Sequence, residues 1–254
     1  MCIRDSPITI PAANVDGPDD LVDFPLLVSV DLDETHVEDA NGYDILFTDV
    51  NGAALDYERE SYNNATGELL AWVRIPLLST TVDTEIKILY GNASISADQT
   101  SPTAVWSSDY QGVWHFENSF EDATILSIDG TNNGTTDIAG QIGRARNYVP
   151  NQYISLPDNN TVGFNVDQFV FSAWIQIPNA PVGNRLPYMW IGNTGDIVDN
   201  AFFVTMLRDE QPQLFARDEV GIFTFVSDNI LSIGDWHYIV SIVDFTAATD
   251  NLSI

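Results

Sequence analysis

The feature that most constrains this chain is a side-chain alternation with a period of two residues, which recurs in short segments along the sequence. Successive side chains of a β-strand point to opposite faces of a sheet, so this period predicts strands with one buried and one exposed face. No stretch shows a sustained helical period, and turn residues bound most of the segments. We therefore predict an all-β protein.

The predicted strands fall into two groups, separated by a polar segment at residues 96–112 that is poor in strand pattern. The first group covers residues 8–15, 23–32, 43–49, 54–62, 69–78 and 85–92. The second group covers residues 112–118, 152–157, 169–178, 188–193, 201–209, 213–218, 223–229 and 236–245. Each group has enough strands to bury a core of its own, which predicts two tandem antiparallel β-sandwiches.

The predicted domain limits follow from these groups. Residues 7–105 form the first sandwich, residues 106–112 the linker, and residues 113–254 the second sandwich. The opening "MCIRDS", residues 1–6, differs in character from the strand-like sequence after it, and we interpret it as a non-native leader.

The charge balance limits the possible partners. The chain has 37 Asp and Glu against 9 Lys and Arg, for a net charge of −28. Binding to nucleic acid or to an anionic membrane surface depends on basic side chains, so both are poor partners. Hard cations such as calcium prefer oxygen ligands and suit an acidic surface. No apolar run of about 18 residues is present, which argues against insertion into a membrane.

The first half of the chain resembles a known family. Its ordered motifs are "DFPLLVSV", "GYDILFTDVNGAALDYERESYNNATGELLAWVRIPLL", "EIKILYGN" and "VWSSDYQGVWHFEN". Together they resemble a bacterial family of domains of unknown function, the DUF2341 type, over roughly residues 8–112. Domains of this type often precede a laminin-G-like domain in secreted or surface proteins of bacteria.

The second half is similar to laminin-G-like, concanavalin A-like jelly-roll domains. The motifs that carry this likeness are "GVWHFENSFEDAT", "GQIGRARNYVPNQYISLP", "FVFSAWIQI" and "GDWHYIVSIVDF". The likeness implies binding of glycans or proteins, often near a calcium ion at the rim. The chain ends at "DNLSI", where such domains continue into further strands, so we expect this jelly roll to be incomplete.

Two Trp-His pairs raise the question of catalysis: Trp114-His115, which Glu117 follows closely, and Trp236-His237. In a strand each Trp heads an apolar stripe, which predicts core tryptophans and histidines that make local hydrogen bonds. A zinc site from His115, His237 and Glu117 would require the two strands to be neighbours, and we give this alternative little weight.

The run "LDYERESY" places Asp56, Glu58 and Glu60 on one face of a strand. This run permits a carboxylate pair or a cation site. We favour an exposed acidic stripe that Arg59 and Arg74 partly balance. The chain has no paired-carboxylate pattern typical of concanavalin A-like glucanases, and no nucleophile elbow, zinc-protease motif or phosphate loop.

Calcium is the one cofactor that we expect to be possible, and its candidate ligands are Asp129, Asn132, Asn133 and Asp137 in "DGTNNGTTD". Turn formation explains the same residues without a metal. Aromatic side chains bind sugar rings by stacking, and Tyr188 and Trp190 are the candidates here.

We therefore expect a noncatalytic binding or adhesion module of an exported bacterial protein, located outside the cell or at its surface, with polysaccharide as its partner. Two alternatives stay open. The chain could supply the ancillary domains of a glycan-degrading enzyme whose catalytic domain lies outside this sequence, or a structural spacer in a surface protein.

Overall fold

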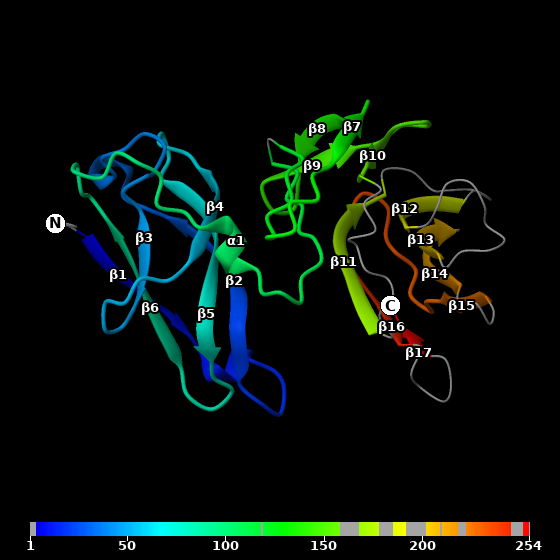
Figure 1. The fold of residues 1–254 in the computed structure, drawn as a ribbon, viewed down its shortest axis with the longest axis horizontal. Helices are drawn as coiled ribbons and strands as arrows, with labels where there is room; N and C mark the ends of the chain where they lie inside the picture. The colour runs from blue at the N-terminus through cyan, green and yellow to red at the C-terminus, as the bar shows by residue number, and fades with distance from the viewer. Residues whose placement is uncertain are drawn as a thin grey trace. The chain divides into compact units, whose positions relative to one another are not determined.

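The structure is a computed structural model, and it describes residues 4–117, 119–157, 168–177, 185–191, 202–208, 210–217, 222–244 and 251–253. The chain divides into two compact units, residues 1–162 and 163–254. Strands dominate both units, and every strand pair is antiparallel (Figure 1). The predicted all-β fold is confirmed.

The first unit contains two three-stranded sheets, in the orders β1-β6-β3 and β2-β5-β4. Their strands are β1 (Arg4–Ile10), β2 (Leu21–Asp31), β3 (Leu46–Asp49), β4 (Tyr57–Tyr62), β5 (Glu68–Leu78) and β6 (Thr84–Tyr90). Short 3-10 turns, Ala12–Asn14 and Glu34–His36, lie beside β2. Each of these six strands overlaps a segment that the alternation predicts, because one of its faces meets the core.

Strand β5 shows how the sequence fixes the two faces of its sheet. Leu69, Ala71 and Val73 are buried in the core between the two sheets, whereas Trp72 and Arg74 lie on the opposite, outer face. The core of the sandwich consists of Val28, Leu32, Ile45, Phe47, Leu55, Tyr57, Leu69, Ala71, Val73, Ile75, Leu78, Ile86, Ile88 and Tyr90.

After β6 the chain becomes less regular. It continues into α1 (Pro102–Val105), β7 (Thr131–Asn133), β8 (Thr136–Ala139), β9 (Arg144–Asn147) and β10 (Tyr153–Ser155). Strands β7 and β10 form one two-stranded sheet, and β8 and β9 form another.

The predicted strand at residues 112–118 is wrong over its described part, because residues 112–117 form no strand. Phe116 has a φ of 60°, which lies in the left-handed region and is incompatible with a strand. Trp114 and His115 are half-buried. The alternation in this segment therefore reflects individual contacts and not the pleat of a sheet.

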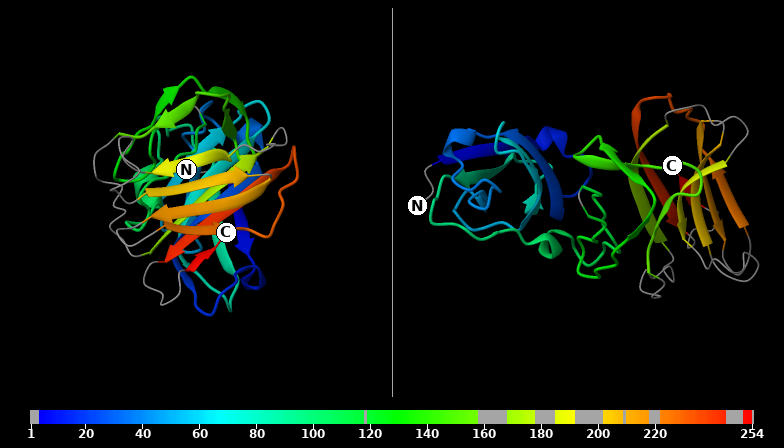
Figure 2. Two further views of the ribbon diagram at one scale, coloured as in Figure 1. Left: turned by 90° about the vertical axis from the view of Figure 1, so that its right-hand side faces the viewer. Right: turned by 90° about the horizontal axis from the view of Figure 1, so that it is seen from above.

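The second unit contains a three-stranded sheet, β11-β16-β17, and a four-stranded sheet, β12-β13-β14-β15. Viewed from above, the two sheets form two layers (Figure 2). Their strands are β11 (Gln168–Gln176), β12 (Arg185–Ile191), β13 (Phe202–Arg208), β14 (Gln211–Arg217), β15 (Ile222–Val226), β16 (Trp236–Asp244) and β17 (Asn251–Ser253). Ile177, Leu207, Leu231 and Ile239 are buried together in this unit.

The division into units groups residues 106–157 with the first sandwich. The predicted limits instead assign residues 106–112 to a linker and residues 113–254 to the second domain, and these limits stay predictions. Strand β1 begins at Arg4, so it includes Arg4–Ser6 of the interpreted leader.

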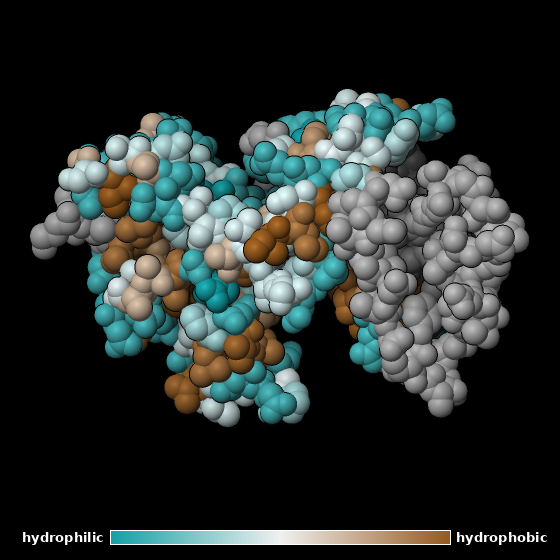
Figure 3. Space-filling view, in the orientation of Figure 1, coloured by the Kyte–Doolittle hydropathy of each residue, from teal (hydrophilic) through white to brown (hydrophobic). Residues whose placement is uncertain are grey.

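The face of the first unit that Figure 3 shows carries hydrophilic residues interrupted by apolar patches. One patch lies at the end of β2 and β5, where Val22 pairs with Leu77 and both side chains are exposed. Within the described residues, no helix has the length and apolar character that a membrane span requires.

Candidate functional sites

Two sequence motifs that lie far apart in the chain meet on the outer face of the first sandwich. His115 reaches two glutamates of β4: its Nε2 lies 3.1 Å from Oε2 of Glu58, and its Nδ1 lies 3.6 Å from Oε2 of Glu60. The side chains of Glu60, Glu58 and His115 are 2%, 14% and 15% exposed. We call these three residues the carboxylate–histidine cluster.

A β-bulge in β4 lies at Glu60. Arg59 pairs with Ala71 of β5 and Ser61 pairs with Leu70, so Glu60 has no opposite residue. Such a bulge inserts one unpaired residue and redirects its side chain. Glu60 and Glu58 both reach His115 on the face away from the core.

Two tryptophans complete the surroundings of the cluster. The indole Nε1 of Trp72, on β5, donates a hydrogen bond to Oε2 of Glu60 at 2.6 Å. The indole Nε1 of Trp106, directly after α1, donates to Oε2 of Glu58 at 2.9 Å. The His115 ring stacks on Trp72 at 5.8 Å between centroids and lies tilted against Trp106 at 5.7 Å.

This small aromatic layer covers the outer face of the sheet. Trp106, Val105 and Ala123 are buried together, and Trp72 and Val113 pack against them. The segment after the sandwich therefore contacts the sheet through apolar packing as well as through hydrogen bonds.

Burial and charge act in opposite directions on His115. Burial alone lowers the pKa of His115, but the hydrogen bond with Glu58 and the charges of the neighbouring carboxylates outweigh it and raise the pKa above 6.5. Burial raises the pKa of Glu60, while the charge of His115 and the indole of Trp72 oppose this rise. Glu60 and His115 therefore influence each other's protonation.

Glu117 is a third carboxylate beside this cluster. Burial raises the pKa of Glu117, and the backbone amide of Arg144 lowers it. Its buried Oε2 atom has no hydrogen-bond partner among the described residues. Gly143 permits this close approach, because a Cβ atom there would lie 2.3 Å from Oε2 of Glu117 and 3.0 Å from Oε1 of Glu60.

The expectation of an exposed acidic stripe is wrong for Glu58 and Glu60, which lie beneath Trp106 and His115. It is correct that Arg74 balances the acidic run, because Arg74 forms an ion pair with Asp56. The covering segment begins more than forty residues after β4, and the short-range pattern carries no signal for it.

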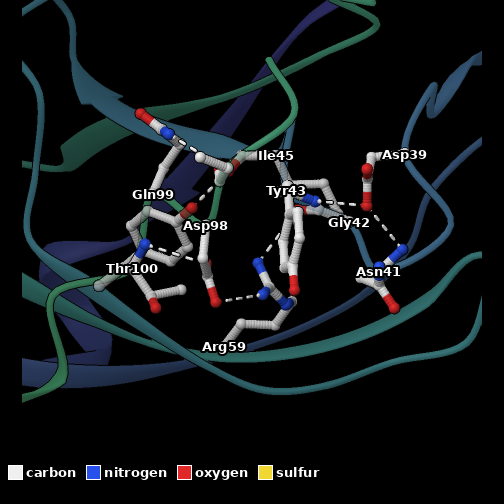
Figure 4. A network of polar contacts seen from close by, with 11 residues as sticks. Asp39, Asn41, Gly42, Tyr43, Ile45, Arg59, Asp98, Gln99 and Thr100 are labelled. Carbon is white, nitrogen blue, oxygen red and sulfur yellow. Dashed lines mark hydrogen bonds and ion pairs between the residues drawn. The ribbon is translucent and has the colours of Figure 1, made fainter.

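Arg59, in contrast to Arg74, does not balance the acidic run. Its side chain donates to the carbonyl oxygen of Gly42 at 3.1 Å and forms an ion pair with Asp98 at 3.0 Å (Figure 4). The guanidinium also lies over the ring of Tyr43, 5.3 Å from its centroid. Arg59 thus joins two loops at the rim of the sandwich.

The two histidines of the Trp-His pairs differ in their contacts. The Nε2 atom of His237, in β16, lies 3.0 Å from the backbone oxygen of Ser232, which confirms the predicted local contact. The prediction is wrong for His115, whose partner Glu58 lies 57 residues away. Trp114 and Trp236 are half-buried and not fully within a core.

Two of the candidate calcium ligands serve turns. Oδ1 of Asp129 accepts a hydrogen bond from the backbone N–H of Asp122 at 3.0 Å. Oδ1 of Asn132 accepts bonds from the backbone N–H and the hydroxyl of Thr135, both at 2.8 Å. These side-chain oxygens therefore stabilise local turns.

The other two candidates lie on short strands. Asn133, in β7, donates from its side chain to Oγ of Ser155 at 3.1 Å. Asp137, in β8, forms ion pairs with Arg144 and Arg146 of β9. The described residues contain no group of three or more His, Cys, Asp and Glu side chains arranged to hold a metal ion. Calcium binding at these four residues stays a prediction.

Tyr188 and Trp190, the candidates for sugar stacking, lie in β12 next to an irregularity between Pro187 and Met189. Their side chains lie outside the described part of the structure.

A different aromatic pair is exposed in the same unit. Trp174 of β11 lies opposite Tyr238 of β16, with the ring centroids 5.3 Å apart. The two residues are 40% and 54% exposed. The alternation in residues 169–178 places Trp174 on the same strand face as the exposed Val170, so the sequence held a signal for this pair.

Comparisons with known proteins support one part of the expected family relationships. Residues 41–135 match the family model described as "Domain of unknown function (DUF2341)". The match spans β3 to β7 and includes the carboxylate–histidine cluster, Trp72 and Trp106. No curated protein and no solved structure matches the chain.

Proposed function

We propose that this protein is a noncatalytic binding module that recognises polysaccharide, in an exported protein at or outside the cell surface. The observation that carries the proposal is the exposed pair Trp174 and Tyr238 on neighbouring strands of one sheet. A sugar ring presents an apolar face of C–H groups, and aromatic side chains bind that face by stacking.

The surroundings of the pair suit a sugar chain. Val170 of β11 and Ile242 of β16 lie opposite each other and are also exposed, which extends the apolar strip along the sheet. Ser172 and Gln176 of β11 are exposed between and beside these residues and supply polar groups. Alternating apolar and polar contacts match a ligand that has both C–H faces and hydroxyl groups.

The net charge of −28 narrows the class of polysaccharide. An acidic surface repels strongly anionic polymers unless a divalent cation bridges the two partners. We therefore propose a neutral polysaccharide as ligand, or an acidic one in the presence of calcium. A laminin-G-like jelly roll in the second unit would agree with this role.

The carboxylate–histidine cluster supports the noncatalytic part of the proposal. Its three side chains are at most 15% exposed, and their polar contacts are with one another and with two indoles. A polymeric substrate has no access to reacting atoms in such a layer.

A glycan array and affinity electrophoresis, each with calcium and with a chelator, test the proposal on the full chain. We expect a Kd in the range of about 1 μM to 1 mM per site for a shallow, exposed surface. Trp174→Ala and Tyr238→Ala should each weaken binding at least about tenfold, because each removes a stacking surface. Tyr153→Ala is the matched control, since Tyr153 is an equally exposed tyrosine of the first unit.

Two results would contradict this assignment. If no glycan binds in either condition while one protein partner is captured specifically, the chain is a protein-interaction module or a spacer. If binding occurs but neither Trp174→Ala nor Tyr238→Ala weakens it, the ligand occupies another surface.

A further inference from the structure

We propose that Glu58, Glu60 and His115 form a proton-dependent latch that holds residues 106–117 against the outer face of β4 and β5. The latch is closed while His115 carries its second proton, and it loosens when that proton is lost. This inference is independent of the proposed polysaccharide binding.

The contacts of the segment converge on the same two carboxylates. At its beginning, the indole of Trp106 donates to Glu58. Near its end, the imidazole of His115 lies within 3.1 Å of the same Oε2 atom of Glu58 and 3.6 Å from Glu60. Both ends of the segment are thus tied to one pair of side chains on β4.

The positive charge in the latch comes from one side chain, His115. Within the described part of the chain, the ion pairs that Glu58 and Glu60 form are both with His115. The charge of Glu117 also acts on His115 and adds a third negative group. The nearby arginines of β9, Arg144 and Arg146, pair with Asp137 of β8. Among the described residues, the imidazolium is therefore the cation that pairs with the two glutamates of β4.

When His115 loses its positive charge, its attraction to the two glutamates is lost and the repulsion between the glutamates remains. A neutral imidazole leaves two carboxylates close together in a largely buried layer, where like charges repel more strongly than in water. The geometry thus links the protonation of His115 to the attachment of the segment.

The sign of the pH dependence follows from the shifted groups. The pKa of His115 is raised above 6.5, so its contribution to stability is complete below about pH 6.5 and is lost as the pH rises through the folded value. The pKa of Glu60 is also raised, because burial penalises its charge, and its influence has the same sign. Mild acid closes the latch and mild alkali opens it.

The latch lies at the point where the chain leaves the first sandwich. Residues 106–117 are the segment through which the chain leaves the first sandwich, after α1. The latch therefore determines how firmly the following residues are anchored to that sandwich.

A pH titration of the full, 15N-labelled chain by NMR tests the proposal. The probes are the indole N–H signals of Trp72 and Trp106 and the imidazole signals of His115, each assigned by a Trp→Phe or His→Gln variant. Trp174 is the control indole, because it lies in β11 of the second unit, outside residues 106–117.

We expect the two cluster indoles and His115 to move with one common midpoint, which lies above pH 6.5. Above that midpoint, the solvent exchange of the Trp106 indole hydrogen should quicken up to about tenfold per pH unit after correction for the intrinsic rate. The indole of Trp174 should show neither change. Glu58→Gln should lower the midpoint of His115, since it removes one of the two neighbouring charges while keeping the shape of the side chain.

Three outcomes would overturn the latch: separate midpoints for the indoles and His115, the same Trp106 exchange on both sides of the midpoint, or an equal response of Trp174. Persistence of the indole transition in His115→Gln would also overturn it. If His115→Gln does not fold, the unmodified chain and Glu58→Gln still decide the question.

Discussion

Asp44 and the Glu58–Glu60 pair are both buried carboxylates of the first sandwich, but the protein neutralises them by different means. Asp44 is fully buried, and its two oxygens accept hydrogen bonds from the backbone N–H groups of Glu38, Asp39, Gly91 and Asn92. Glu58 and Glu60 are held by side chains, those of His115, Trp72 and Trp106.

The two kinds of support differ in whether the hydrogen-bond donor can lose its proton near neutral pH. A backbone amide keeps its proton near neutrality, so the donors that hold Asp44 do not change there. An imidazole loses its proton near neutrality, so the support of Glu58 and Glu60 varies. A carboxylate held by backbone N–H groups fixes a loop through donors that do not titrate near neutrality. A carboxylate held by a histidine makes a contact that depends on pH.

The largest expected effect comes from breaking the backbone-held site. Asp44→Asn places amide hydrogens against several backbone N–H donors and removes the charge that they bind, which should lower the free energy of unfolding of the first unit by about 3–5 kcal/mol. Urea denaturation followed by far-UV circular dichroism measures this loss. Asp19→Asn, at an exposed site, is the control. A loss below about 1 kcal/mol would show that the loop does not depend on Asp44.

Breaking the histidine-held site should have a smaller effect that depends on pH. His115→Ala leaves the two buried glutamates without their cation, and we expect a loss of about 2–3 kcal/mol at pH 6. The loss should be smaller at pH 9, because the imidazole of the unmodified protein is less protonated there than at pH 6. Denaturation curves at both pH values provide the test, and polysaccharide binding should be unchanged. An equal loss at both values would remove the distinction from Asp44.

Arg59 offers a third means of support, through a guanidinium in place of an imidazole. Arg59→Lys keeps the charge beside Asp98 but cannot also keep the bond to the carbonyl of Gly42 and the contact with Tyr43. We expect a loss of about 1 kcal/mol that is the same at pH 6 and pH 9. Denaturation at the two pH values measures it, and a pH-dependent loss would contradict this account.

The smallest expected effect is in acid, where the sign is opposite to that of the latch. The hydrogen bond from Arg74 lowers the pKa of Asp56 below 3.8 against the opposing effect of burial, so its contribution is present above that pH and is lost as the pH falls. Asp56→Asn should move the midpoint of acid unfolding by less than about 0.5 pH unit, since the pair is partly exposed. An acid titration followed by circular dichroism measures the shift, and Asp19→Asn again serves as the control.

The sequence predicted the strands that have a clear buried face. The alternation in residues 69–78 identified β5, because every second side chain of β5 meets the core. The strands β7, β8 and β9 are only three or four residues long and show too little of the pattern to be recognised. Residues 112–117 carry an alternation without a strand, because their side chains contact a neighbouring face individually.

The carboxylate–histidine cluster could be predicted only in its parts. The acidic run and the Trp-His pair are both visible in the sequence, but their meeting depends on how the chain returns across the sheet after α1. Trp72 was the available signal: it lies opposite Glu58, on the face of β5 that the alternation leaves outside the core. A large aromatic side chain on such a face indicates that a further segment covers it.

The bulge at Glu60 has a consequence for the length of the chain. Arg59 pairs with Ala71 and Ser61 with Leu70, so the ladder between β4 and β5 would be continuous if residue 60 were deleted. Glu60 is thus a supernumerary residue, and the sandwich can be built without it. Removal of this single codon would leave Tyr62 opposite Leu69 and take one acid out of the buried layer. Insertion or deletion of Glu60 adds or removes one residue of β4, and the pairing of the sheet can stay intact.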